Sequence, residues 1–240
     1  MKVILIGYGK MGKAIEDVLL ASGDEIIARV TQENRYTLSP DLLQQADVAI
    51  EFTTPDAAVE NILSCLNAGL PVVSGSTGWY DHLESVSAHC KDKEGAVLYA
   101  PNFSIGVNLF FALTRQFASL MKNHPHYIPS ITEIHHTEKK DAPSGTAIRA
   151  AEVLLTELNT YSGWTLNAPT DHHGIGIRAI REPHVPGTHQ ITFSSASDRI
   201  EISHEAFTRK GFAEGAVTAA RFLIGKKGIF TMQDVLQLPY

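Results

Sequence analysis

The glycine-rich turn after the first apolar run constrains the fold of this chain more than any other feature. Lys2–Ile6 is a short apolar run, typical of a buried parallel strand, and residues 7–12 read Gly-Tyr-Gly-Lys-Met-Gly. A helical pattern follows as far as Leu19. In G-x-G-x-x-G the first glycine permits a tight turn, the second lets the backbone approach a pyrophosphate, and the third allows close helix–strand packing. Because strand and helix flank the motif as it requires, we expect a dinucleotide site rather than a turn that only packs two elements.

Strands and helices then alternate through the first half of the chain. Further strands are expected at residues 26–30, 47–52, 71–74 and 96–99, with helical patterns between them. This alternation predicts right-handed βαβ units and a parallel sheet.

The pattern changes after about Gly106. A long helix over 108–121, a strand over 130–136 and a helix over 144–158 precede an irregular polar stretch at 159–174; three strand candidates (175–181, 189–195, 199–204) and a helix over 212–223 follow. We therefore predict an α/β chain with an N-terminal Rossmann-like, doubly wound parallel sheet and a smaller α+β domain of about four strands. The expected domains are 1–106, which binds a dinucleotide, 107–207, which binds substrate, and a C-terminal segment, 208–240.

Composition narrows the class of protein. Apolar residues make up 44% and charged residues 19%, as in ordinary globular proteins, and the formal charge of −6 argues against non-specific binding to nucleic acid or to an anionic membrane. There is no apolar run of membrane-spanning length. The two cysteines, Cys65 and Cys90, form no Cys-x-x-Cys pair, which favours a reducing compartment. We expect a cytoplasmic protein.

The cofactor site is expected to extend beyond the glycines. Tyr8, Lys10 and Met11 belong to the turn, and Lys10 either adds positive charge near the phosphates or is a solvated cation. At the end of the second strand, where an acid would read a ribose 2′-hydroxyl, Thr31 stands instead. The choice between NADH and NADPH stays open, because Arg29 or Arg35 could serve a 2′-phosphate and Thr31 a hydroxyl.

Two loops at the carboxyl ends of later strands complete this prediction, because open α/β sheets bind ligands at that edge. One contains Gly75, Ser76 and Thr77, and the other runs from Ala100 and Pro101 to Asn102 and Phe103. We expect Asn102 to hydrogen-bond a carboxamide and Phe103 to offer its ring to a nicotinamide. Taken alone, each loop also reads as an ordinary turn.

Residues 133–147 carry the chemistry. Histidine suits proton transfer near neutral pH, and lysine supplies a cation and a proton donor, so His135, His136 and Lys139 stand out. Ser144 is expected to cap a helix whose first amides, at Gly145 and Thr146, favour a carboxylate. Strand alternation sends His135 and His136 to opposite faces, so we expect no metal site. A second pair, His172 and His173, is expected at the surface.

The stretch Glu-Ile-His-His-x-x-Lys-x-Asp-Ala-Pro-Ser-Gly-Thr from Glu133 resembles the motif of bacterial 4-hydroxy-tetrahydrodipicolinate (dihydrodipicolinate) reductases, enzymes of diaminopimelate and lysine biosynthesis. The glycine turn, Gly75-Ser76-Thr77, Ala100–Phe103 and Gly106-Val107-Asn108 recur in the same order, so the resemblance spans nearly the whole chain. It implies that His135 is the proton donor and acceptor, Lys139 a proton donor, and His136, Gly145 and Thr146 substrate-binding residues. Thr31 departs from the acid that many members carry.

The resemblance further implies an NADH- or NADPH-dependent reduction of a small cyclic dicarboxylate to tetrahydrodipicolinate, with loss of water. It also implies a homotetramer assembled through the sheets of the substrate domains, and a final segment that returns to the nucleotide domain. Two alternatives remain: another Rossmann-fold dehydrogenase of a small carboxylate, or a non-catalytic NAD(P)-binding sensor. A nucleophilic cysteine would favour a semialdehyde dehydrogenase, but Cys65 and Cys90 lie in predicted helices. A sensor has no need of His135 and Lys139 together.

Overall fold

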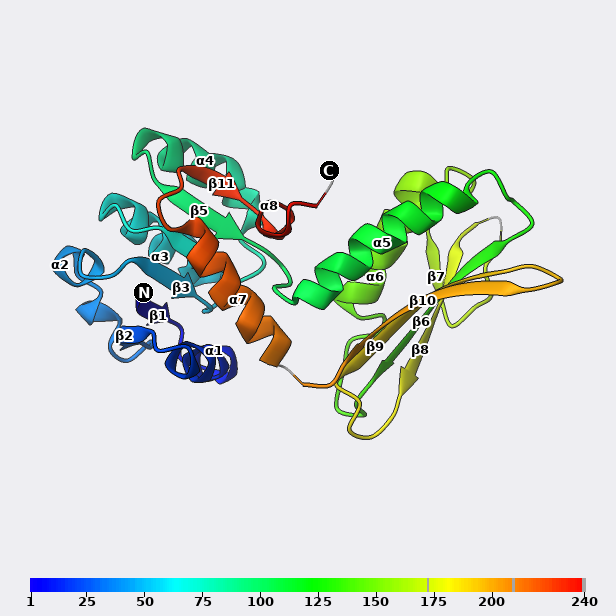
Figure 1. Ribbon diagram of the computed structural model, residues 1–240, viewed down its shortest axis with the longest axis horizontal. Coiled ribbons are helices and arrows are strands. Elements are labelled where there is room, and N and C mark those ends of the chain that lie inside the picture. The colour runs from blue at the N-terminus through cyan, green and yellow to red at the C-terminus, as the bar shows by residue number, and fades with distance from the viewer. Residues whose placement is uncertain (172, 209, 239–240) are drawn as a thin grey trace. The chain divides into compact units, whose positions relative to one another are not determined.

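The chain forms two compact units in this computed structural model, which describes residues 1–171, 173–208 and 210–238. The first unit combines Met1–Ile105 with Lys210–Tyr240, and the second is Gly106–Arg209. Each has its own sheet (Figure 1). Of the pair expected at the surface, His173 is exposed and His172 lies outside the described residues.

The first unit is built on a parallel sheet of six strands in the order β11-β5-β4-β3-β1-β2. The doubly wound parallel sheet expected from the sequence is confirmed. β1 lies between β2 and β3, so the chain reverses its direction of travel across the sheet there, and ligands of such sheets bind at the carboxyl ends of these strands. The strands are β1 (Lys2–Ile6), β2 (Glu25–Val30), β3 (Val48–Glu51), β4 (Val72–Ser74), β5 (Ala96–Tyr99) and β11 (Gly228–Phe230).

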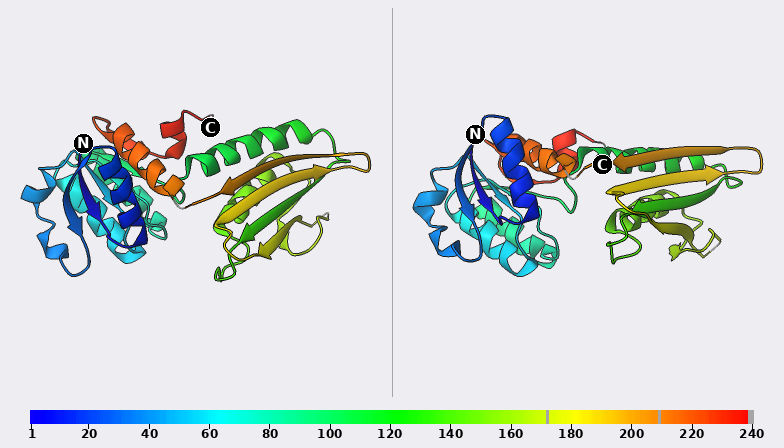
Figure 2. Two further views of the ribbon diagram at one scale, coloured as in Figure 1. Left: turned by 60° about the horizontal axis from the view of Figure 1, so that its bottom comes forward. Right: turned by 90° about the horizontal axis from the view of Figure 1, so that it is seen from below.

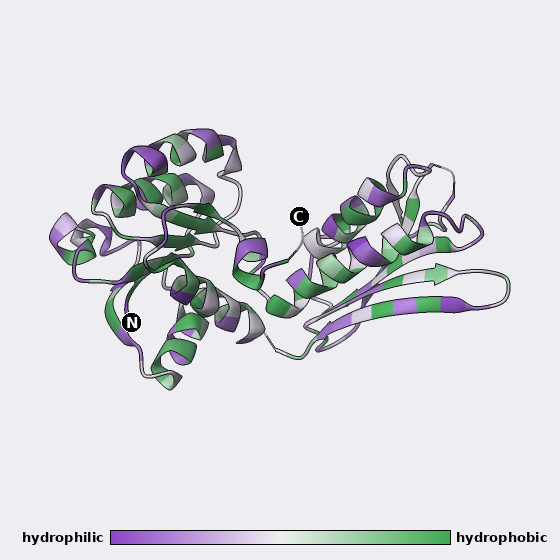
Figure 3. Ribbon diagram, turned by 45° about the horizontal axis from the view of Figure 1, so that its top comes forward, coloured by the Kyte–Doolittle hydropathy of each residue, from purple (hydrophilic) through white to green (hydrophobic). Residues whose placement is uncertain are grey.

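Helices cover both faces of this sheet, which explains why its strands are continuously apolar. Val3 and Leu5 pack with α1 and α7, while Ile4 and Ile6 pack with α2, α3 and α4. Figure 3 shows hydrophobic strands in the middle of the unit and hydrophilic positions on the helices around them. The helices are α1 (Lys10–Ala21), α2 (Pro40–Leu43), α3 (Pro55–Asn67), α4 (Leu83–Asp92) and α7 (Lys210–Leu223), with short 3₁₀ turns at Arg35–Thr37 and Tyr80–His82.

The C-terminal segment completes the first unit. α7 packs closely because it is rich in small residues: a Cβ at Gly215 would lie 1.7 Å from the carbonyl oxygen of Phe103. β11 then pairs with β5, and α8 (Met232–Leu236) begins at a capping box made by Thr231 and Asp234. The pairing of β11 was not expected, because three residues are too few to show a strand period.

The second unit has a mixed sheet in the order β10-β9-β6-β8-β7. β6 (Ile128–His135) runs parallel to β8 (Ile175–Arg181) and antiparallel to β9 (Gly187–Ser194), and β9 forms a hairpin with β10 (Arg199–Ala206), as Figure 2 shows. The expectation of four strands and an irregular stretch at 159–174 is wrong, because Trp164–Leu166 forms β7 at the edge of the sheet. Its three residues are too few to establish a strand period in the sequence.

Helices α5 (Ile105–Met121) and α6 (Gly145–Glu157) share one core with this sheet, in which Phe117 meets Phe193 with ring centroids 4.7 Å apart. Ser144 caps α6 as predicted, because its hydroxyl accepts the Ala147 N–H at 3.2 Å. Across the described residues of this unit, the helices pack on this one face.

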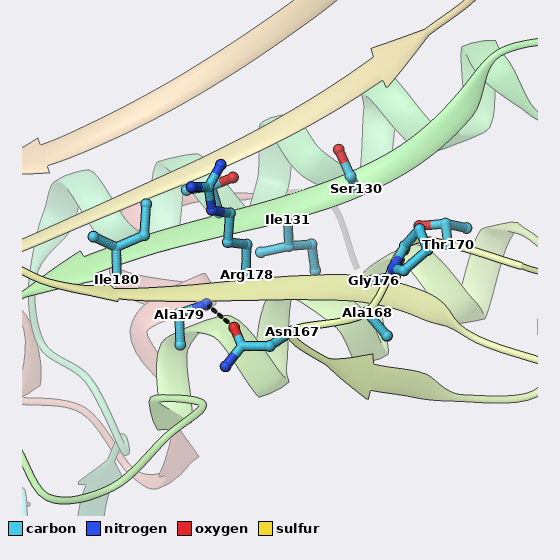
Figure 4. A pocket seen from close by; sticks show the side chains of 11 residues that line it. Ser130, Ile131, Asn167, Ala168, Thr170, Gly176, Arg178, Ala179 and Ile180 are labelled. Atoms are coloured by element: carbon cyan, nitrogen blue, oxygen red, sulfur yellow. Dashed lines mark hydrogen bonds between the residues drawn. The ribbon is translucent and has the colours of Figure 1, made fainter.

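The opposite face carries a hollow of about 690 Å³ between β6, β8 and the segment after β7, where the Asn167 side chain accepts the Ala179 N–H at 2.9 Å (Figure 4). Within residues 1–171, 173–208 and 210–238, we find no helix with the length and apolar character needed to cross a bilayer.

Candidate functional site

The turn between β1 and α1 needs glycine for its fold at two of its three glycine positions. Gly7 has φ +97°, and a Cβ there would lie 2.0 Å from the carbonyl oxygen of Phe52. A Cβ at Gly12 would lie 2.3 Å from the carbonyl oxygen of Gly7, so helix and strand touch there. A Cβ at Gly9 would meet no atom within 4 Å, and no side chain caps α1 at this residue. Open backbone at an uncapped helix start suits an approaching phosphate.

Side chains around this turn form a charged network. The Tyr8 hydroxyl donates to Glu16, which also pairs with the Arg29 guanidinium. The bond from Arg29 lowers the pKa of Glu16, and the bond to Glu16 raises the pKa of Tyr8. Arg29, one of the two candidates for binding a 2′-phosphate, is therefore already paired with Glu16. Thr31 follows β2, and its N–H lies 2.6 Å from Asn34 Oδ1.

Hydrogen bonds to a buried carboxylate fix the start of the loop after β4. Glu51, at the end of β3, is fully buried and accepts hydrogen bonds from Ser74 Oγ at 2.6 Å and Ser76 Oγ at 2.8 Å. Ser76 Oγ also accepts the Thr53 N–H at 2.8 Å. The Ser76 hydroxyl is thus engaged inside the unit, while Thr77 is exposed. Glu51 was not singled out in the sequence.

The loop after β5 buries Phe103. The residue is 2% exposed and its ring packs 5.6 Å from that of Phe52, and its contact with a nicotinamide stays a prediction. Pro101 is exposed and Asn102 partly exposed, while Ala100 is buried. The Asn102 side chain accepts the Ser104 N–H at 2.9 Å, which fixes the loop.

In the second unit, His135 is the last residue of β6 and lies two residues after Glu133 on the same face. Its Nδ1 is 3.4 Å from Glu133 Oε2. The same carboxylate receives the Ser144 N–H at 3.0 Å on Oε2 and the Arg181 guanidinium at 3.2 Å on Oε1. Glu133 is 0% exposed, so these contacts replace water around its charge.

Burial and polar contacts shift the pKa values of Glu133 and His189 in this cluster. Burial raises the pKa of Glu133, but hydrogen bonds from His135 and Ser144 outweigh it and hold the pKa at about 2. Burial, helped by the nearby His135, lowers the pKa of His189 to about 3. The two imidazole rings lie 5.0 Å apart, and His189 Nε2 is 3.1 Å from Ser144 Oγ. At neutral pH Glu133 is therefore an anion and His189 is neutral.

Lys139 lies at the same end of β6. Its ammonium donates to both carboxylate oxygens of Asp141, at 2.9 and 2.8 Å, and this contact lowers the pKa of Asp141. The charge of Lys139 lowers the pKa of His189 less than burial, His135 and His204 do.

The residues expected to bind substrate lie beside this cluster. His136 lines an open hollow of about 270 Å³ with Glu138 and the 184–186 loop. A Cβ at Gly145 would meet no atom within 4 Å, so the first turn of α6 borders open space, and Thr146 is partly exposed there.

Glu133, His135 and His189 also form a group whose possible ligand atoms lie within 4.8 Å of one another. The sequence did not indicate this group, because the pairing of β6 with β9 brings His189 to it. Its carboxylate is already bonded to Arg181 and Ser144, and the guanidinium charge opposes a divalent cation. The expectation of no metal site stays a prediction.

Comparison with known proteins identifies the family. The model described as "Dihydrodipicolinate reductase, N-terminus" matches residues 1–103, and that for the C-terminus of the same proteins matches residues 106–236. The chain belongs to the dihydrodipicolinate reductase family. Membership makes it an oxidoreductase and implies a nicotinamide cofactor, as the resemblance predicted.

The sequence aligns with those of named relatives over most of their length. The 4-hydroxy-tetrahydrodipicolinate reductase of Christiangramia forsetii is 44% identical over 236 residues, 98% of each chain. That of Methanopyrus kandleri is 39% identical over 206 residues, covering 83% of this chain and 74% of its own. The dipicolinate-bound dihydrodipicolinate reductase from Paenisporosarcina sp. TG-14 has the same fold, with a TM-score of 0.76 at 22% identity over 96% of this chain and 97% of its own.

The alternative of a semialdehyde dehydrogenase also fails on the chemistry of the thiols. Cys65 in α3 and Cys90 in α4 are both buried, and burial raises the pKa of each thiol. A buried thiol with a raised pKa is a poor nucleophile at neutral pH.

Proposed function

We propose that this chain reduces 4-hydroxy-tetrahydrodipicolinate to tetrahydrodipicolinate in the diaminopimelate route to lysine, with His135 and Lys139 as the residues that move the proton. Family membership supplies the reaction. The observation that supports the residue assignment is the end of β6, where His135 lies beside the buried Glu133 carboxylate and the Lys139 ammonium, just after the strand, pairs with Asp141. An acid–base pair at such a place suits the protonation of a ring that gains negative charge.

The same reasoning assigns the carboxylates of the substrate. The amides at Gly145 and Thr146 stand at the positive end of α6, and an anion is favoured there. His136 borders the neighbouring hollow and adds a hydrogen-bond donor. Clamping two carboxylates orients the ring, and orientation alone can lower a barrier by several kcal/mol.

The cofactor residues follow from the first unit. The open backbone at Gly9 and the start of α1 would hold the pyrophosphate, and Thr31 the adenosine ribose, with Thr77 and Asn102 at the edge where ligands of such sheets bind. When bound, the nicotinamide supplies the hydride. Thr31 carries no charge that would repel a 2′-phosphate, so we propose that both NADH and NADPH serve.

We further propose a cytoplasmic homotetramer assembled through the sheet of the second unit. The face of that sheet opposite α5 and α6 exposes a hollow lined by Ser130, Thr132 and Arg178 (Figure 4). Polar, partly exposed side chains on a broad sheet face suit contact with a second copy.

Steady-state kinetics with freshly generated substrate test the residue assignment. We expect His135→Ala to lower kcat by about 10²–10⁴-fold with little change in the KM of the substrate, because the proton is transferred only in the transition state. Lys139→Ala should lower kcat and raise KM. Lys140→Ala, which changes the exposed neighbour, is the matched control and should resemble the parent. Unchanged turnover in His135→Ala would contradict the role of His135.

A further inference from the structure

A buried carboxylate, Glu133, lies between His135 and groups at the start of α6 and on β8. Glu133 Oε2 lies 3.4 Å from His135 Nδ1, the Ser144 N–H at the start of α6 donates to that oxygen, and Arg181 of β8 donates to the other. Arg181 also donates to the carbonyl of Asp141 at 2.7 Å, so the carboxylate is fixed from both sides. These partners fix the position of the Glu133 carboxylate, and a fixed carboxylate can orient the neighbouring imidazole of His135.

The charge state of Glu133 determines which nitrogen of His135 carries the proton. The carboxylate is ionised at neutral pH and can only accept hydrogen bonds. The buried Nδ1 of His135 has no closer polar partner among the described residues. An Nδ1–H directed at Glu133 leaves Nε2 as the basic atom.

The other edge of the imidazole faces a glycine. A Cβ at Gly187 would lie 3.1 Å from His135 Nε2 and 3.3 Å from Cδ2, so any side chain at this position would crowd Nε2. His189, two residues further along the same face of β9, stays neutral and does not compete for the carboxylate charge. Glu133 therefore interacts with two cationic partners, Arg181 and the protonated form of His135.

We propose that Glu133 is a positioning residue that fixes the Nδ1–H tautomer and the orientation of His135, and so keeps Nε2 available for proton transfer. Arg181 and Ser144 hold the carboxylate in place for this purpose. The proposal rests on the proton-transfer role of His135 and adds to it a residue that does not touch the substrate.

The direct test is the isosteric variant Glu133→Gln, which keeps the volume and removes the charge. We expect kcat to fall by about 10- to 100-fold, part of the gain from general acid–base catalysis, while the KM of the substrate changes by less than about threefold. Glu152→Gln is the matched control, because it breaks an exposed Glu–Arg pair in the same unit. A kcat within twofold of the parent in folded Glu133→Gln overturns the proposal.

The double variant separates positioning from a structural role. If Glu133 acts through His135, adding Glu133→Gln to His135→Ala should lower kcat by less than about twofold more, because the interaction is already gone. A further loss equal to that of the single variant contradicts the proposal. If His135→Ala alone keeps full turnover, the assigned role of His135 fails instead.

NMR of ¹⁵N-histidine-labelled parent protein gives a readout that does not depend on the variant folding. We expect neutral His135 to show Nδ1 protonated and Nε2 unprotonated, and Glu133→Gln to shift this tautomer balance. An Nε2–H tautomer in the parent overturns the proposal whatever the kinetics show.

Discussion

The buried imidazole of His189 links the stability of the second unit to pH. His189 is 4% exposed and has a pKa of about 3 in the folded chain, against about 6.5 when unfolded. Between these values the unfolded state binds the extra proton, so the free energy of unfolding falls as pH drops below 6.5. Glu133, with a pKa of about 2, adds a further loss only below about pH 4.5.

The His189→Asn variant should remove the fall in the free energy of unfolding that His189 causes below pH 6.5. Between pH 7.5 and 5.5 we expect the parent to lose about 1.4 kcal/mol of unfolding free energy through this group, and the variant to lose correspondingly less. Urea unfolding at the two pH values measures the difference. His82→Gln, a change at an exposed histidine, should keep the parent's dependence on pH. Equal slopes for parent and His189→Asn would refute the assignment.

At the scale of single elements, the β1–α1 turn separates glycines required by the fold from the glycine available to a ligand. Gly12→Ala should destabilise the chain by about 1–3 kcal/mol, because the new Cβ overpacks against the Gly7 carbonyl. Gly9→Ala should change stability by less than about 1 kcal/mol but raise the KM of the cofactor severalfold. Thermal unfolding and cofactor titration together check this pair. Similar cofactor affinity in Gly9→Ala and the parent would argue against a phosphate at this turn.

We propose that Thr31, at the end of β2, determines the choice of cofactor. Thr31→Asp places a carboxylate where a ribose would lie, so we expect the KM for NADPH to rise about tenfold or more while that for NADH changes little or falls. Kinetics with each cofactor measure the ratio. Thr37→Asp, on the exposed 3₁₀ turn nearby, controls for added charge alone. A parallel rise in both KM values would place the ribose elsewhere.

Long elements with a clear period were predictable, and short ones were not. The pattern around the glycine turn led to α1, and Ser144 marked the start of α6, because each signal lies within a few adjacent residues. β7 and β11 have three residues each, and their pairing depends on strands distant in the sequence.

The candidate site divides in the same manner. Residues 135–146 could be named from their own motif, whereas Arg181 and His189 reach it only through the pairing of β8 and β9 with β6. Alternation along β6 could have indicated Glu133, since it shares a face with His135. The burial of Phe103 could not be read locally, because α7 from the far end of the chain packs over its backbone.

At the scale of the whole molecule, the proposed tetramer uses the sheet face of the second unit opposite α5 and α6. Thr132 lies on that face, so Thr132→Glu should introduce repelling charges between copies and dissociate the assembly without loss of secondary structure. Analytical ultracentrifugation with circular dichroism measures both. Gln116→Glu, on the exposed side of α5, is the control and should leave the mass unchanged. An intact tetramer in Thr132→Glu would place the interface elsewhere.

The first unit is assembled from two stretches of chain, and this has a consequence for synthesis on the ribosome. Met1–Ile105 emerges first but lacks α7, β11 and α8 until Lys210–Tyr240 follows. The second unit, Gly106–Arg209, is continuous in sequence, so all of it is synthesised before Lys210–Tyr240. We therefore expect the second unit to complete its fold before the first. Until α7 and β11 are synthesised, one apolar face of the first sheet and the edge of β5 stay exposed. Chaperones would be needed most at this stage.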